Sequence, residues 1–288
     1  NTKKIFMNID MYRDEINHID NPVEIENILS KFEQEISQLL YDKILDKDTI
    51  VISRKELESL RIFLFLLSFR SDSRMKQYKE KKFDIKTLNY LGGEDIDFLN
   101  LWKNEIEALA KCRTYRDIEE SEILDDIIKT EFKNDLNGYY MTFFDVRGSE
   151  LILGDIYPTL EIFPFSNGIN IHMHCIYPLS PTRLLLLSHI MFKDNGTSLL
   201  SGIKKTSRIN NKLIIPPKNK YVSTFSYTEN DTFIYKVQKL YENDIKYINS
   251  LQLNESRIGF IFRNKDKVVS SIENYNEYEK KKHDKIII

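Results

Sequence analysis

The stretch that decides the fold is GSELILGDIYPTLEIFPFSNGINIHMHCIYPLSPTRLLLLS, residues 148–188. Short apolar runs alternate in it with glycine, proline and asparagine, which is typical of strands joined by turns. Ser166-Asn167-Gly168 has the composition of a hairpin turn. Pro178 and Pro181 indicate a strand end or a sheet edge, because proline cannot donate to a strand ladder. We therefore predict an antiparallel meander with strands at 151–153, 160–163, 169–177 and 184–187.

Most of the chain before this stretch has a helical period instead. Apolar residues recur every three or four positions, and Ser53 followed by Glu56 has the pattern of a capping box. The pattern predicts helices at 22–44, 54–82, 94–112 and 115–133, and one later helix at 232–251. A closing strand is expected at 257–262.

The expected fold class is therefore α+β, with an N-terminal helical layer packed on a mostly antiparallel sheet and one late covering helix. The parts are a helical region 1–136, a sheet region 137–270 that includes the late helix, and a charged tail 271–288. We expect them to form one integrated domain.

Composition narrows the functional class. Apolar residues make up 41% and charged residues 30% of the 288-residue chain, which predicts a folded core rather than disorder. The net charge of −2 gives no general attraction to nucleic acid or anionic membranes. The longest apolar run, 62–69, is far shorter than the roughly 20 residues that cross a bilayer, so no membrane partner is expected.

Cysteine content and the N-terminus bear on the compartment. Only Cys112 and Cys175 occur, and no signal peptide is recognised, which favours a reducing cytoplasm. The chain starts with Asn1 rather than methionine, so we expect that an upstream segment has been removed or left out.

Arg70 directly follows the apolar run of the second predicted helix. One interpretation is that the helix reaches the surface here and Arg70 extends its charged end into water. The other is that its planar guanidinium binds a carboxylate or a phosphate. A run of acidic residues between 117 and 126 could hold a divalent cation, although such runs more often form the wet side of a helix.

His172 and His174 are one residue apart on a predicted strand, so both imidazoles should face the same side. They are weak metal candidates, and Asp155 and Glu161 are the carboxylates that could complete such a site. A nuclease of the restriction type would need a lysine two residues after Glu161, where Phe163 stands. No cofactor is indicated by a motif, and a divalent metal stays an open alternative.

Residues 201–220 contain six basic residues and no acidic one. A loop of this length is usually either functional or disordered, and the sequence favours neither. If the loop is functional, Lys204, Lys205 and Arg208 are the candidate residues for binding nucleic acid or a partner protein.

Several of these features, taken in order, resemble an uncharacterised bacterial family. That family has an "HYVPQ"-like opening, an "IE…E" helix, a helix ending in "R-T/S", an "SD-N-P" strand end, a "PLSP" strand and a late asparagine. The corresponding residues here are Val23-Glu24-Ile25-Glu26 with Glu33, Arg70-Ser71, Asp155 before Pro158, Pro178-Leu179-Ser180-Pro181 and Asn249. The resemblance covers about residues 20–263. The opening motif is absent, and the spacing from Asp155 to Pro158 is one residue longer than in the family.

The resemblance implies a site made of Glu33, Arg70, Asp155 and Asn249 beside the histidine of the opening motif. Such a set suits hydrolytic chemistry. The first functional hypothesis is a hydrolase or nuclease-like effector in phage defence or toxin biology. The alternative is a non-catalytic regulatory module that binds protein or nucleic acid. In a third, structural reading, Arg70 and Asp155 form a buried pair that pins the helical layer to the sheet.

Overall fold

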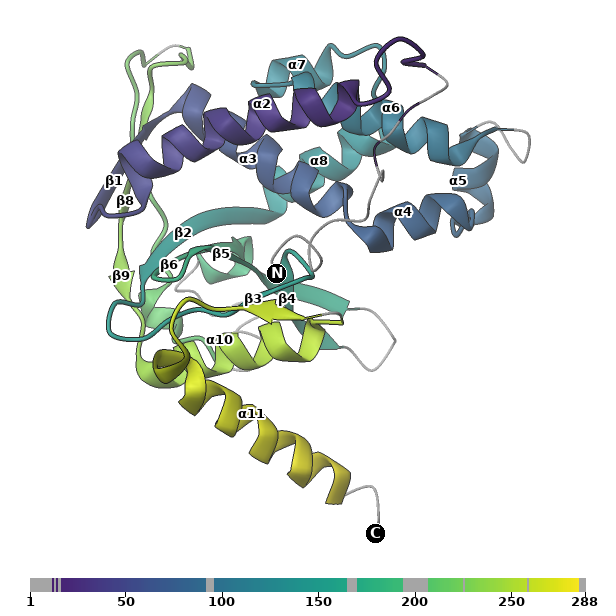
Figure 1. Cartoon of the computed structure of the whole chain (residues 1–288). Coiled ribbons are helices and arrows are strands. Elements are labelled where there is room, and N and C mark those ends of the chain that lie inside the picture. The colour runs from purple at the N-terminus through teal and green to yellow at the C-terminus, as the bar shows by residue number, and fades with distance from the viewer. Residues whose placement is uncertain are drawn as a thin grey trace.

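The centre of the structure, a computed structural model, is a five-stranded sheet in the order β4-β5-β6-β2-β9 (Figure 1). The structure describes residues 12, 14, 17–91, 96–164, 170–193, 207–224, 226–257 and 259–284. Neighbouring strands of the central sheet are antiparallel, except for the parallel pair of β2 and β9. The strands are β2 (Tyr139–Asp145), β4 (Thr159–Pro164), β5 (Asn170–Ser180), β6 (Arg183–His189) and β9 (Gln238–Lys239).

The structure confirms the α+β class, and the predicted meander is present with two differences. Strand β5 continues through Pro178, which lies where the register between β5 and β6 shifts. At an irregularity the ladder tolerates a residue without an N–H. The predicted strand at 151–153 is reduced to β3 (Leu153–Gly154), which pairs with β10 (Phe260–Ile261) outside the central sheet.

The helical layer covers one face of the sheet. Its first helix, α2, continues into a short π-helix, Leu40–Ile44, and these two together match the predicted helix at 22–44. The helices of the layer are α2 (Glu24–Leu39), α3 (Arg54–Phe69), α4 (Asp72–Lys79), α5 (Ile85–Tyr90), α6 (Phe98–Lys111), α7 (Tyr115–Glu119) and α8 (Asp126–Gly138).

Two predicted helices are each split in two, and in both cases a capping residue causes the split. The capping box of Ser53 and Glu56 begins α3 as predicted, but Ser71 then accepts the N–H of Arg74 and starts α4. Asp125 caps α8 in the same way, which separates α8 from α7. Serine and aspartate side chains compete with the helix for backbone N–H groups, and therefore favour a new helix start over continuation.

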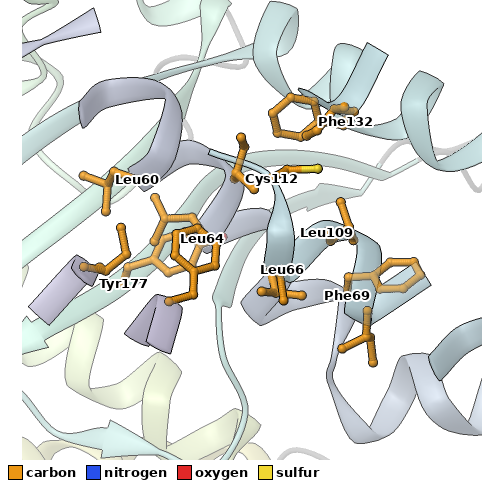
Figure 2. Packing of buried hydrophobic residues seen from close by; sticks show 14 of the residues in the cluster. Leu60, Leu64, Leu66, Phe69, Leu109, Cys112, Phe132 and Tyr177 are labelled. Carbon is orange, nitrogen blue, oxygen red and sulfur yellow. The ribbon is translucent and has the colours of Figure 1, made fainter. Parts of the chain in front are cut away.

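Apolar side chains join the helical layer to the sheet. In Figure 2, Leu60 and Leu64 of α3 lie beside Tyr177 of β5, while Leu109 of α6 and Phe132 of α8 extend the same buried cluster. Burial of such side chains stabilises the layer by about 1.5–3 kcal/mol each.

Helix α10 (Glu242–Glu255) covers the opposite face of the sheet (Figure 1). Its Ile245 and Ile248 belong to a second buried cluster with Leu184 and Leu186 of β6. Helix α11 (Lys265–Asp284) packs on α10, and its Ser271 is buried. The central sheet is therefore buried on both faces.

The predicted helix at 232–251 is wrong over its first part. Thr232–Lys236 form strand β8, which pairs with β1 (Thr49–Ser53) and with β7 (Lys218–Lys220) in a second sheet of order β1-β8-β7. Phe233 and Tyr235 are buried there, so the period over these residues is two and not 3.6. Because β1 comes from the helical region, this sheet joins the two predicted regions of the chain.

Arg183 adds a polar link between the layers. Its guanidinium is buried and donates to the carbonyl oxygen of Leu45, at 2.6 and 2.9 Å, and to that of Lys47, at 2.9 Å. These carbonyls follow the first helix, where a cation is favoured. Within the described residues, no helix combines the length and the apolar composition needed to cross a membrane.

Gly154 is where β3 approaches α10 most closely. A Cβ atom at this position would lie 2.4 Å from Ser256 Oγ and 3.2 Å from the backbone oxygen of Gln252. We expect Gly154→Ala to lower the free energy of unfolding by about 1–3 kcal/mol in urea denaturation. Gly138→Ala is the matched control, since a Cβ there meets nothing within 4 Å. Equal stability of the two variants would contradict this close packing.

Candidate functional site

Two cavities adjoin each other in the helical layer. Their volumes are about 200 Å³ and about 240 Å³, and Arg74, Gln77 and Glu131 line both. The first cavity also contacts Glu105 and has apolar walls from several side chains of the layer. An apolar cavity of about 150 Å³ holds a benzene ring, so each cavity has room for a molecule the size of one ring.

Glu105 of α6 has an unusual environment for a carboxyl group. It is completely buried, and its Oε2 accepts a hydrogen bond of 2.7 Å from the hydroxyl of Tyr78. Its Oε1 has no hydrogen-bond partner within the described part of the chain. Burial raises the pKa of Glu105 to about 7, with smaller contributions from neighbouring charges. A carboxyl group with this pKa can take up and release a proton near neutral pH.

Arg74 of α4 lies in both cavities and is held on several sides. Its Nη1 donates to Gln77 Oε1 at 3.0 Å, and its Nη2 donates to a carboxylate oxygen of Glu131. The guanidinium also lies over the rings of Phe69 and Tyr78, 5.1 and 5.8 Å from their centroids. Its buried Nε has no partner among the described residues. Glu105 and Arg74 therefore line the same cavity, and each has one buried atom, Oε1 and Nε respectively, without a partner among the described residues.

Two of the four residues suggested by the family resemblance lie in the same helical layer. Arg70 ends α3 and forms an ion pair of 2.7 Å with Glu33 of α2. The backbone oxygen of Arg70 accepts a hydrogen bond from the Tyr12 hydroxyl. Arg70 thus reaches a carboxylate, as one reading of the sequence proposed. Its ion pair is with Glu33 rather than with Asp155, so the predicted pin between helical layer and sheet is not formed by Arg70 and Asp155.

The other two residues belong to the side of the sheet that α10 covers, because Asn249 lies in α10 and Asp155 directly follows β3, which contacts α10. Asp155 accepts the backbone N–H of Arg257 at 2.9 Å. Asn249 is fully buried, and its side chain bonds to the N–H of Ile152, the carbonyl of Glu150 and the hydroxyl of Ser271. The sheet therefore separates these two from Glu33 and Arg70, and a shared catalytic role for all four stays a prediction.

The candidate basic segment is described only in part. Lys204 and Lys205 lie outside the described residues. Arg208 is described, and its backbone N–H donates to Glu161 Oε1 at 3.1 Å while its guanidinium lies 5.3 Å from the ring centroid of Tyr247. The start of the described segment thus contacts the sheet and α10.

The two strand histidines have different surroundings. His172 is exposed and His174 is completely buried, because the register between β4 and β5 shifts beside Glu161 and breaks the simple alternation. Glu161 Oε2 lies 3.7 Å from His174 Nε2, and the ring centroid of Phe192 lies 4.4 Å from that of the imidazole. In the described ranges, no three His, Cys, Asp or Glu side chains are grouped as metal ligands. The expected convergence of both histidines with Asp155 and Glu161 is not seen.

Glu161 and His174 instead begin a buried polar row across four strands. The strand registers place Glu161, His174, Ser188 and Tyr140 opposite one another on β4, β5, β6 and β2, so they share the face below α10. Both ring nitrogens of His174 and the hydroxyls of Ser188 and Tyr140 lack partners in the described structure.

Burial disfavours the charged forms of the ionisable groups in this row. Burial lowers the pKa of His174 to about 3 and raises the pKa of Glu161. Glu161 accepts from the Ser207 hydroxyl, from the Arg208 N–H and from the Tyr247 hydroxyl. An imidazole with so low a pKa is a poor general base at neutral pH. The Glu161–His174–Ser188 row is therefore a weaker candidate for a catalytic site than Glu105 and its cavity.

Comparison with known proteins identifies a family whose function is not known. Residues 1–267 match the model of the family described as "Protein of unknown function (DUF4238)". The chain belongs to this family. No curated protein and no solved structure matches the chain. The predicted membership of an uncharacterised family is confirmed, while the correspondence of individual motifs stays a prediction.

In this DUF4238 protein, Glu105 and Tyr78 were not among the site residues predicted from the sequence. A signal was present, because Glu105 lies next to Ile106 on the apolar stripe that Trp102 and Leu109 also occupy. A carboxyl on the buried stripe of a helix needs a partner or a raised pKa.

The polar contacts of Asn249 predict a structural role. Asn249→Ala leaves the buried backbone groups of Ile152 and Glu150 without partners. Each such loss costs about 1–3 kcal/mol, so we expect the free energy of unfolding to fall by about 3 kcal/mol. Ser250→Ala, one position further along α10, is the control, because its hydroxyl bonds only within the helix. Unchanged stability of Asn249→Ala with lost function would instead favour the implied catalytic role.

His174 predicts a pH dependence of stability. Its pKa is about 3 in the folded protein and about 6.5 in the unfolded chain, so the unfolded state binds more protons between these values. Stability therefore falls as the pH drops below 6.5. Relative to His174→Gln, wild type should lose about 1.4 kcal/mol per pH unit between pH 6 and 4, as measured by urea denaturation.

His172→Gln is the control for this measurement, because His172 lies on the same strand but its side chain is exposed, whereas that of His174 is completely buried. Partial desolvation lowers the pKa of His172 as well, so the comparison shows whether the effect belongs to His174. That variant should keep most of the wild-type dependence on pH. Parallel pH curves for wild type and His174→Gln would show that His174 is not held neutral.

Proposed function

We propose that this protein is a hydrolase whose general base is Glu105. The observation that carries the proposal is the unpaired Oε1 of a fully buried carboxyl group at the wall of a cavity of about 200 Å³. The Tyr78 hydroxyl holds the other oxygen of the carboxyl group. We propose that Oε1, which is buried in the structure, accepts a proton from a water molecule or substrate that enters the cavity.

The two unpaired groups have complementary roles in hydrolysis. Ionised Glu105 takes a proton from water through Oε1, and the water oxygen bonds to the acyl carbon or the phosphorus of an ester. Negative charge develops on the carbonyl oxygen or a non-bridging phosphoryl oxygen, to which the Nε–H of Arg74 can donate a hydrogen bond. The proton then passes from Glu105 to the leaving oxygen, and the ester bond breaks. Glu131 and Gln77 keep Arg74 in place during this step.

A nuclease-like effector in phage defence or toxin action is a narrower form of this proposal. Cleavage of a phosphodiester would be its signature. The alternative, a regulatory module that binds protein or nucleic acid, uses the outer surface and is compatible with catalysis in the helical layer. The proposed setting is the bacterial cytoplasm, supported by two free buried thiols, Cys112 and Cys175, and by the resemblance to a bacterial family.

The test is hydrolysis of two chromogenic substrates, p-nitrophenyl acetate and bis(p-nitrophenyl) phosphate. Glu105→Gln keeps the shape and the hydrogen bond with Tyr78 but removes the base, so kcat should fall by about 100-fold or more. In wild type, kcat/KM should rise as the pH increases through about 7, the pKa of Glu105. The preferred substrate separates acyl from phosphodiester chemistry.

Glu107→Gln is the matched control on the same helix, because Glu107 pairs with His18 and Lys111 and does not line either cavity. Folding is checked by the urea midpoint at pH 8. There Glu105→Gln should be at least as stable as wild type, because a carboxyl with a raised folded pKa loses stability as the pH rises above its unfolded pKa. Equal turnover by Glu105→Gln and wild type, or no turnover of either substrate by wild type, would overturn the proposal.

A further inference from the structure

The second sheet, β1-β8-β7, has an outer face that differs from the rest of the molecule. Ile50, Ile52, Phe233 and Tyr235 turn inward to the core. The other residues of β1 and β8 alternate with them, and Lys218 and Lys220 of the edge strand β7 stand opposite Ile234 and Thr232. Because paired residues share a face, the two lysines lie on the outer side with Val51, which is 46% exposed.

Beyond β7 the chain turns back to β8, and two tyrosines lie on this turn. Tyr221 is 52% exposed and Tyr227 is 77% exposed, and their ring centroids are 5.8 Å apart. The hairpin that carries them extends from the small sheet at the upper left of Figure 1. Both tyrosines lie between β7 and β8, on the connection that closes this hairpin.

Charge on this hairpin is slightly positive. Residues 218–236, from β7 to the end of β8, contain three lysines, Lys218, Lys220 and Lys236, and two acidic residues, Glu229 and Asp231. Arg54 lies 4.7 Å from the ring centroid of Tyr227 and is paired with the buried Asp231. Glu229, exposed nearby, is 4.0 Å from Lys55. The hairpin thus has a net positive charge although the whole chain has a net charge of −2.

Protection of a sheet edge explains only part of this surface. Lysines on an edge strand prevent pairing with other chains, which accounts for Lys218 and Lys220. Protection of the edge does not account for two neighbouring tyrosines that are more than half exposed. Exposed aromatic rings beside lysines are what proteins use to bind unpaired nucleotides, since bases stack on the rings and phosphates bind the cations.

We propose that the β7–β8 hairpin and the outer face of its sheet bind single-stranded nucleic acid. Bases stack on Tyr221 and Tyr227, and the backbone phosphates contact Lys218 and Lys220. This surface is independent of Glu105, since neither cavity is lined by any residue of the hairpin.

The experiment is fluorescence anisotropy with a labelled 20-nucleotide oligo-dT, an oligo-rU of equal length and a duplex, at several salt concentrations. Wild type should bind the single strands and bind the duplex at least 10-fold more weakly. Lys218→Glu with Lys220→Glu should weaken binding by about 10-fold or more at low salt. The slope of log K against log salt should become shallower by about 1.4, because two phosphate contacts are lost.

Tyr227→Ala separates stacking from charge. It should weaken binding of the single strands by about 10-fold and leave the salt slope unchanged. The control, Lys31→Glu with Lys133→Glu, makes the same change in net charge at exposed positions of α2 and α8 and should leave binding unaffected. Circular dichroism checks that each variant is folded.

Three outcomes would each overturn the proposal. They are failure of wild type to bind either single strand at 50 mM salt, binding of the duplex as tightly as the single strands, and an equal loss of affinity in the control variant. Glu105→Gln should bind the oligonucleotides as wild type does. A negative result for hydrolysis would therefore not affect the test of nucleic-acid binding.

Discussion

Burial of the central sheet on both faces is the constraint on which the rest of the structure depends. In β6, Leu184 and Leu186 pack toward α10, while Leu185 and Leu187 pack toward the helical layer. A strand in this position must be apolar on both sides, and any polar side chain on it must be neutral or fully bonded. The helical layer covers one of these faces, and α10 covers the other. Their positions determine which ionisable groups lose contact with water.

Two of the buried carboxyl groups, Glu161 and Glu105, show how differently the same constraint can be met. Glu161 accepts three hydrogen bonds, from Ser207, Arg208 and Tyr247, and its neighbour His174 is neutral. Glu105 accepts one hydrogen bond, from Tyr78, and its second oxygen has no partner in the described structure. A satisfied carboxyl stabilises a packed interface, whereas an unsatisfied one with a raised pKa beside a cavity is a candidate for proton transfer. This difference is why the candidate site lies in the helical layer.

Local signals predicted much of the fold. The apolar run of β6, the strand of His172 and His174, and the capping box at Ser53 were all evident from neighbouring residues. Predicted elements were wrong where pairing with a distant segment outweighed the apolar spacing of neighbouring residues. Residues 232–236 have apolar spacing that also suits a helix, but β1 pairs with them from about 180 positions earlier in the chain. The split after Arg70 had a local signal in Ser71, yet the apolar period of α3 outweighed it.

The sequence by itself determined the α+β class, most element positions and the family, because periodicity, turn residues and caps act over a few neighbouring positions. It also marked Arg70 as a residue that could bind a carboxylate. Only the tertiary structure decided that Glu33 is its partner, that Asn249 bridges buried backbone groups, and that Glu105 meets Tyr78 and Arg74 at a cavity. The physical reason is that the pKa and the bonding of a side chain depend on burial and on partners from distant segments. No local pattern encodes which segments will meet.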